Sequence, residues 1–182
     1  MRTKLYFIIL LTINLLSCNK DKNTFIVKSG DKDLTINLHT YSDTLSAIEL
    51  RIDDSLHSSW PLRYPVYQFD HGNITGDKTV IAVGVIKPTR FDPKPDKRLF
   101  LFKITDDNYI RPLWLGSRVA QPLEDFKVIN SLEPALIRTI EREQDGTFLV
   151  AKYKWRGFGL EFIDYIRRGI SLEEAQKLLQ KG

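Results

Sequence analysis

The chain has 182 residues, including 27 Lys and Arg, 23 Asp and Glu and a single cysteine, and its formal net charge is +4. This mildly basic, evenly mixed composition lacks the clustered positive charge of nucleic-acid-binding proteins, so we expect no nucleic-acid partner. One cysteine excludes a disulfide within the chain, so the fold must depend on its hydrophobic core.

The first element in the chain is a short secretion signal. Arg2 and Lys4 precede an apolar run over residues 5–16, whereas a transmembrane helix needs about 20 apolar residues. The run ends in Leu15-Leu16-Ser17-Cys18, and polar residues follow at once. This junction resembles the signal of bacterial lipoproteins, in which a small residue precedes the cysteine that is acylated and becomes the new N-terminus.

The lipoprotein resemblance implies that residues 1–17 are removed, that Cys18 is lipidated with palmitate and related acyl chains, and that residues 18–23 form a tether. The protein is then expected in the bacterial cell envelope, anchored to the membrane through this lipid, on the periplasmic or surface face. A plain secretory signal is the alternative, but it leaves Cys18 as an unpaired thiol in an oxidising compartment. Residues 24–182 are expected to form a single β-rich domain.

The first half of this domain reads as strands. Alternating or continuous apolar residues predict strands over residues 24–28, 34–38, 45–52, 66–69 and 79–86. Residues 55–65 are predicted to be irregular, because Pro61 and Pro65 exclude a central strand. Three further prolines then enforce a loop at Pro88, Pro93 and Pro95.

The second half repeats the pattern. Strands are predicted over residues 98–104, 109–115, 135–142, 147–155 and 158–166. Asp145-Gly146 and Arg156-Gly157 are typical hairpin turns. Ser171 and Glu174 form a capping box that predicts a short helix over residues 171–181. The expected fold class is therefore all-β, with antiparallel hairpins forming blade-like sheets or a sandwich and a short C-terminal helix.

One segment resembles a known repeat. Residues 71–84 run through Gly72, Asn73 and Asp77 into an apolar strand that ends in Val83-Gly84, and this phrase is similar to the FG-GAP/VCBS type of β-propeller repeat. The resemblance covers residues 66–166 and implies four-stranded blades. In that family the acidic loop can hold calcium, but a calcium site needs several oxygen ligands, and this chain keeps only Asp70, Asn73 and Asp77. We therefore expect no metal and no cofactor.

Catalytic motifs do not emerge from the sequence. It contains no Gly-x-Ser-x-Gly elbow, and its three histidines lack metal-ligand spacing. Paired carboxylates can hydrolyse glycosides when about 5–9 Å apart, and the candidates are Asp92, Asp96, Glu124 and Asp125. Two function classes remain open. The favoured one is a non-catalytic binding or assembly module for an envelope protein or glycan; the alternative is a small glycan-directed envelope hydrolase.

The predicted binding surface combines arginines with aromatic residues. The loop over residues 88–98 and the stretch over residues 114–118 supply its members, which are Arg90, Phe91, Arg98, Trp114 and Arg118. Such pairs can stack on sugars or anchor a protein partner, and a long proline-rich loop between two strands is often functional. The competing interpretation is that the aromatics pack in the core and the arginines solvate the loop.

Overall fold

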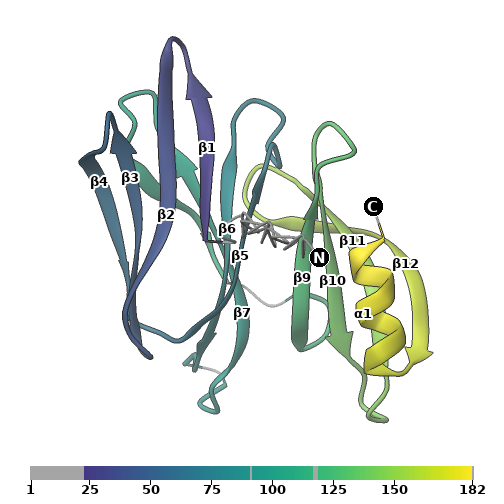
Figure 1. Cartoon of the computed structure of the whole chain (residues 1–182). Helices are drawn as coiled ribbons and strands as arrows, with labels where there is room; N and C mark the ends of the chain where they lie inside the picture. Colours follow the sequence, from purple (N-terminus) through teal and green to yellow (C-terminus); the bar gives the residue numbers. More distant parts are fainter. Residues whose placement is uncertain (1–22, 91, 117–118, 182) are drawn as a thin grey trace, which may run out of the picture.

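The computed structural model describes residues 23–90, 92–116 and 119–181 (Figure 1). The predicted lipidation site Cys18 and the predicted binding residues Phe91 and Arg118 lie outside the described residues. The described chain folds into three antiparallel four-stranded sheets and one short helix. Each sheet consists of four strands that follow one another in the sequence, and the predicted fold class is confirmed.

The first sheet contains β1 (Thr24–Ser29), β2 (Lys32–Ser42), β3 (Leu45–Ile52) and β4 (Ser55–Leu62). The prediction that this last segment is irregular is wrong, since β4 pairs with β3 over its whole length. β4 is the edge strand of the sheet, and an edge strand tolerates Pro61 because a missing N–H on its outer side breaks no ladder bond. The prolines therefore exclude a central strand but not an edge strand.

The second sheet contains β5 (Val66–Gly72), β6 (Val80–Lys87), β7 (Asp96–Ile104) and β8 (Ile110–Leu115). Six consecutive residues of β6, 80–85, are buried, as its continuous apolar sequence predicts for a strand covered on both faces. Gly84 makes this packing possible, because a Cβ there would lie 2.6 Å from Cζ of Tyr67. The Tyr67 ring thus occupies the space over the glycine.

The third sheet contains β9 (Leu123–Ile129), β10 (Leu136–Arg142), β11 (Phe148–Trp155) and β12 (Leu160–Ile170). The sequence predicted three of these strands and missed β9. The helix α1 (Leu172–Gln180) follows, and its capping box is formed as predicted: Ser171 Oγ accepts from the N–H of Glu174, and the Glu174 carboxylate accepts from the N–H of Ser171.

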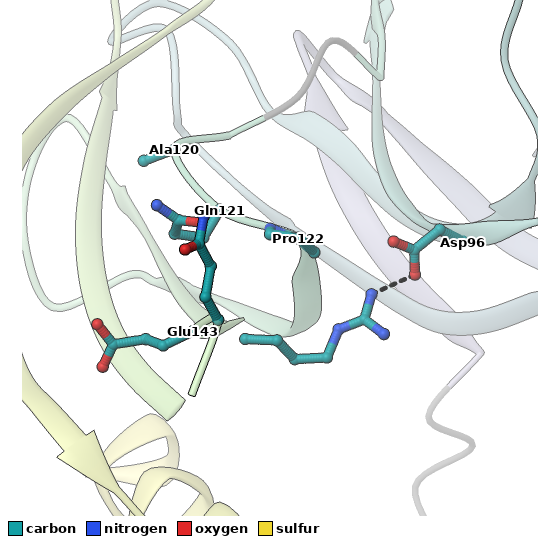
Figure 2. Close-up of a pocket in the computed structure, with 7 residues that line it drawn as sticks. Asp96, Ala120, Gln121, Pro122 and Glu143 are labelled. Atoms are coloured by element: carbon teal, nitrogen blue, oxygen red, sulfur yellow. Dashed lines mark hydrogen bonds and ion pairs between the residues drawn. The ribbon is translucent and has the colours of Figure 1, made fainter. Parts of the chain in front are cut away.

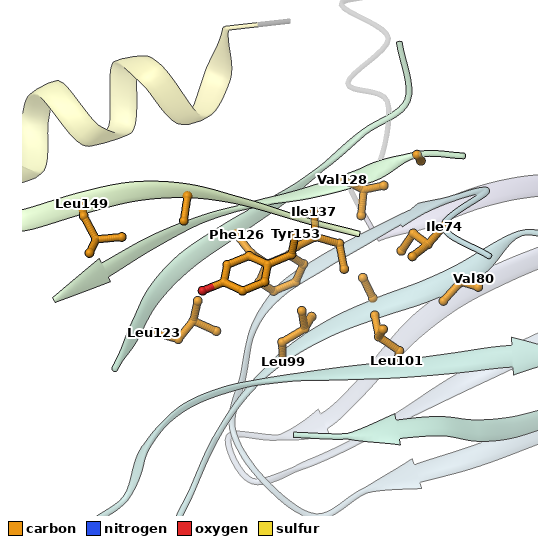
Figure 3. Packing of buried hydrophobic residues seen from close by; sticks show 13 residues of the cluster. Ile74, Val80, Leu99, Leu101, Leu123, Phe126, Val128, Ile137, Leu149 and Tyr153 are labelled. Carbon is orange, nitrogen blue, oxygen red and sulfur yellow. The ribbon is translucent and has the colours of Figure 1, made fainter. Parts of the chain in front are cut away.

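The second sheet lies between the other two and carries a core on each face. One apolar cluster joins it to the first sheet and includes Ile36, Ile48, Leu50, Val83 and Phe102. The other joins it to the third sheet and includes Leu99, Leu101, Phe126, Ile137 and Tyr153 (Figure 3). Alternate residues of β6 and β7 face the two clusters. Both faces of these strands are therefore covered, which is why their apolar sequences are continuous rather than alternating. Helix α1 covers the remaining face of the third sheet with Ala175 and Leu179.

The turns gather at two ends of this stack. The turns that follow β1, β3, β5, β7 and β9 lie at the end drawn uppermost in Figure 1, here called the upper end, which holds residues 30–31, 53–54, 73–79, 105–109 and 130–135. The turn after β11, residues 156–159, lies beside the second sheet, and a Cβ on Gly159 would be 3.7 Å from Nε1 of Trp114. The turns that follow even-numbered strands form the lower end, with the described residues 43–44, 63–65, 88–90, 92–95, 116, 119–122 and 143–147. The described parts of both segments predicted to form the binding surface therefore reach the lower end.

Candidate functional site

A cavity of about 350 Å³ opens at the lower end, between the second and third sheets. It is bounded by the first residue of β7, the segment before β9 and the end of β10. The residues that line it are Asp96, Ala120, Gln121, Pro122, Arg142, Glu143 and Gln144 (Figure 2). Carboxylate, guanidinium and amide groups thus surround one space, and strands on two different sheets hold its charged walls.

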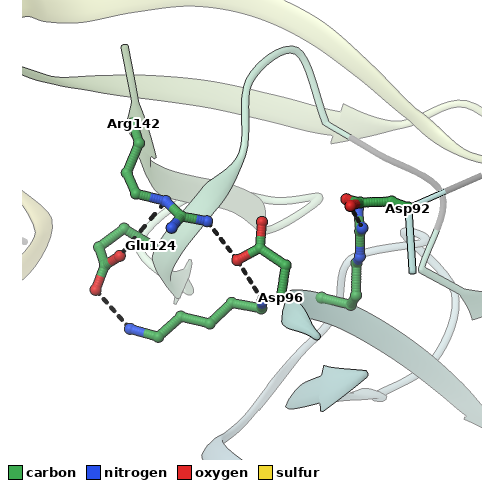
Figure 4. Close-up of polar contacts among 6 residues, drawn as sticks. Asp92, Asp96, Glu124 and Arg142 are labelled. Atoms are coloured by element: carbon green, nitrogen blue, oxygen red, sulfur yellow. Dashed lines mark hydrogen bonds and ion pairs between the residues drawn. The ribbon is translucent and has the colours of Figure 1, made fainter. Parts of the chain in front are cut away.

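Ion pairs connect the two sheets beside this cavity (Figure 4). The Arg142 guanidinium pairs with the Asp96 carboxylate, and its Nε lies 3.7 Å from Oε2 of Glu124. The other oxygen of Glu124 lies 2.5 Å from Nζ of Lys97. All four side chains retain part of their exposure to solvent. A polar ligand can therefore exchange contacts with them without first opening an apolar core.

A buried carboxyl group supports the cavity wall from behind. Glu141 is fully buried and accepts hydrogen bonds from the hydroxyls of Thr139 and Tyr153, at 2.7 and 2.8 Å. Its second oxygen accepts from the N–H of Gln121 at 2.6 Å, and the Tyr153 hydroxyl also accepts from the N–H of Ala120. Burial raises the pKa of Glu141 above its ordinary value, while these hydrogen bonds oppose the shift. The network fixes the segment that lines the cavity.

The three predicted binding residues that the structure describes, Arg90, Arg98 and Trp114, do not line this cavity. Arg90 is exposed on the loop between β6 and β7. Arg98 is buried, and its guanidinium lies 2.8 Å from the Asp92 carboxylate, so it holds that loop against β7. Trp114 is half-buried and packs against the core between the second and third sheets. The two predicted segments do meet, because Cβ of Arg98 lies 3.3 Å from the position that a Cβ on Gly116 would take.

The four carboxylates considered for hydrolysis divide into three environments. Asp96 and Glu124 share Arg142, whereas Asp92 pairs with the buried Arg98 and keeps 35 % of its side chain exposed. Asp125 is half-buried, and burial raises its pKa. Of these four carboxylates, only Asp96 lines the cavity. Glycoside hydrolysis uses two carboxyl groups on either side of one bond, and a second member of this set does not face the cavity.

The side chains named for a calcium loop are engaged in hydrogen bonds within the protein. No group of three or more His, Cys, Asp or Glu suited to a metal occurs among residues 23–90, 92–116 and 119–181. The oxygens named for a calcium loop are used within the protein: Asp70 accepts from the N–H groups of His71 and Val128, and Asn73 accepts from the N–H of Gly76. Asp77 accepts from the Thr75 hydroxyl, and this bond lowers the pKa of Asp77.

The sequence did not point to Arg142, Gln121 or Glu141. A signal for Glu141 exists in its register, because it shares the face of β10 with the buried residues Ile137 and Thr139. A charged residue in that series indicates a buried, hydrogen-bonded group. Arg142 and Asp96 are 46 residues apart, and no local pattern joins them.

No protein-family model, no curated protein and no solved structure matches the chain. Within the described residues, no helix has both the length and the apolar character needed to cross a membrane.

Proposed function

We propose that this protein is a membrane-anchored lipoprotein of the bacterial cell envelope that acts as a non-catalytic binding or assembly module. The observation that carries the binding role is the charged cavity at the lower end, to which the loop over residues 88–98 contributes Asp96. The anchoring role is supported by the Leu15-Leu16-Ser17-Cys18 junction. The partner is an envelope protein or a glycan.

The chemistry of the cavity suits a polar, hydroxyl-rich or charged ligand. The Asp96 carboxylate accepts hydrogen bonds, the Arg142 guanidinium donates them, and the amides of Gln121 and Gln144 do both. Ligand sites commonly present a few such groups on a rigid scaffold. Here the scaffold comprises two strands and a segment fixed by Glu141, so little order has to be gained on binding.

Glycan hydrolysis is the second candidate. The observation in its favour is that Asp96 and Glu124 approach one guanidinium group from the two sheets. A glycosidase needs one carboxyl group protonated and one ionised. Release of reducing sugar from envelope polysaccharide by the native chain, lost in Asp96→Asn, would favour hydrolysis over binding alone.

The anchoring part of the proposal is tested by metabolic labelling with palmitate. The native chain should incorporate the label, and Cys18→Ala should abolish incorporation because it removes the acylated thiol. Anchoring by several acyl chains is stable, whereas one chain holds only weakly. Equal labelling of both chains would disprove lipidation at Cys18.

The binding part is tested with Arg142→Gln, Arg90→Ala and Phe91→Ala, measured by co-sedimentation with purified envelope polysaccharide and by cross-linking to envelope proteins in cells. A binding site predicts loss of capture with little change in melting temperature. Arg111→Gln, at an exposed position beside the upper turn over residues 105–109, is the matched control and should bind normally. If Phe91→Ala instead costs several kcal/mol, as core truncations do, and the arginine variants bind normally, the loop is structural and the proposal fails.

A further inference from the structure

The two ends of the stack differ sharply in charge. The turns of the upper end carry seven exposed carboxylates and one cation, Lys78. The carboxylates are Asp31, Asp53, Asp54, Asp77, Asp106, Asp107 and Glu133. Lys78 pairs with Asp106, so six carboxylates are left, and the exposed Lys32 follows the first of these turns at the start of β2. The upper end is therefore acidic.

The lower end carries its cations on the side formed by the first and second sheets. Arg63, Arg90 and Lys94 are exposed there, and Lys87 lies 4.9 Å from the centre of the Tyr64 ring. The lower turns of the first two sheets hold two carboxylates: Asp92, which pairs with Arg98, and the exposed Asp43. Glu143 and Asp145 lie in the lower turn of the third sheet, away from this side. Within the described part of the chain, Arg63 and Lys94 make no ion pair. These four cations, residues 63, 87, 90 and 94, form what we call the basic rim.

The path of the backbone brings the tether to this same end. β1 runs from Thr24 toward the upper end and pairs with β2 without a register shift. The ladder continues to Asn23, whose carbonyl accepts from the N–H of Leu38. β2 extends a further four residues past Leu38 to Ser42, toward the lower end. The chain therefore enters the first sheet from the side of the lower end.

The length of the tether restricts which end can reach a membrane. Five residue steps separate Cys18 from Asn23, which span at most about 18 Å when fully extended. Measured from Asn23, the lower limit of the first sheet lies four residues along the neighbouring strand, at Ser42, which is about 13 Å at the rise of a strand. In the other direction, the upper turn at Gly30 lies seven residues from Asn23, which is about 23 Å. A lipid on Cys18 can therefore bring the lower end to the bilayer, whereas the upper end lies beyond its reach.

We propose that the lower end rests on the bilayer, with the basic rim against anionic lipid headgroups and the acidic upper end directed away from the membrane. This inference rests on the lipid anchoring proposed above and adds the partner of the lower end. Anionic headgroups attract basic residues at the surface and repel carboxylates within about a Debye length. With this orientation, the cavity beside Arg142 opens at the membrane surface, and its ligand belongs to that surface.

The orientation is tested on the mature lipidated protein, reconstituted into vesicles with and without anionic lipid. Because acylation consumes the thiol of the only cysteine, a second cysteine can be labelled selectively. Thr44→Cys reports the lower end, Ser131→Cys the upper end and Ser59→Cys the outer face of the first sheet, all three at exposed positions. A fluorophore at each position is quenched by a nitroxide on the lipid headgroup.

The expected result is several-fold stronger quenching at position 44 than at positions 131 and 59, and a larger difference with anionic lipid. Arg63→Glu combined with Lys94→Glu should reduce that difference. Lys103→Glu combined with Lys154→Glu changes the net charge by the same amount at exposed positions outside the basic rim. This control should leave the difference in quenching unchanged. Equal quenching at all positions, strongest quenching at 131 or 59, or an equal effect of both double variants would overturn the orientation.

Palmitate labelling separates this proposal from the one on which it rests. A labelled protein with the wrong quenching pattern refutes the orientation and leaves lipidation intact. A native chain that takes up no label refutes both.

Discussion

Replacing Glu141 with Gln tests the network that supports the cavity. The Glu141 carboxyl group is fully buried and accepts three hydrogen bonds, from Thr139, Tyr153 and the N–H of Gln121. A glutamine oxygen can retain the two hydroxyl donors, but its NH₂ group then faces the N–H of Gln121. One buried donor loses its acceptor, which costs about 1–3 kcal/mol. Glu141→Gln should therefore be less stable than the native chain in acid.

The difference in unfolding free energy between the native chain and Glu141→Gln should become smaller as the pH rises. Burial raises the folded-state pKa of Glu141 above its ordinary value, so the folded state binds more protons than the unfolded state between the two pKa values. The contribution of the neutral carboxyl group is complete below the unfolded pKa and is lost as the pH rises through the folded pKa. Each unit of separation corresponds to about 1.36 kcal/mol. The glutamine does not titrate, so only the native chain loses this stability.

Urea unfolding between pH 4 and pH 8 measures both effects. The raised pKa of Asp125 is common to both chains and cancels in the difference. Glu161→Gln, at an exposed position paired with Lys154, is the control and should follow the native chain within a few tenths of a kcal/mol. Parallel pH profiles for the native chain and Glu141→Gln, or a gap that widens with pH, would refute the reasoning.

Substitutions at three further positions test the packing and the helix. Gly84→Ala should cost about 1–3 kcal/mol, because its Cβ would clash with the Tyr67 ring; an unchanged melting temperature would contradict this. Tyr67→Phe should leave stability unchanged or raise it by about 1 kcal/mol, since the hydroxyl is buried and has no hydrogen-bond partner among the described residues, and a clear loss would show that the hydroxyl is bonded. Ser171→Ala should cost about 1 kcal/mol and Ser171→Asp should restore it, because both Ser and Asp cap helices; equal unfolding midpoints for Ala and Asp would argue against the cap.

The fold was predictable where the apolar period is regular, and not where it is interrupted. β6 and β11 were predicted because apolar residues run through them, and β4 was missed because Pro61 looks prohibitive without knowledge that the strand is an edge. β9 was missed for a different reason. Its pairing with β10 shifts register between Ile140 and Glu141, so that Leu123 and Phe126 are both buried although three residues apart. That spacing follows neither the period of a strand nor a local turn signal.

The site was predictable only in part for the same physical reason. A loop with three prolines and several cations can be recognised from the sequence, and this loop forms one side of the lower end. The cavity, however, depends on how two sheets approach each other. Asp96 and Arg142 come from strands that are 46 residues apart, and their pairing depends on the stacking of the second and third sheets.

The second and third sheets contact each other differently at their two ends, and this difference explains why the cavity lies at the lower end. Toward the upper end, the second and third sheets are joined closely: Asp70 accepts from the N–H of Val128, and a Cβ on Gly72 would lie 2.6 Å from the Val128 side chain. At the lower end, the two sheets are connected by partly exposed ion pairs, such as that between Asp96 and Arg142, rather than by apolar packing. Exposed pairs contribute about 0–1 kcal/mol each, whereas removing a buried apolar side chain costs about 2–5 kcal/mol. Separating the sheets therefore costs least at the lower end, and a ligand that replaces the ion pairs can enter there without disturbing the core.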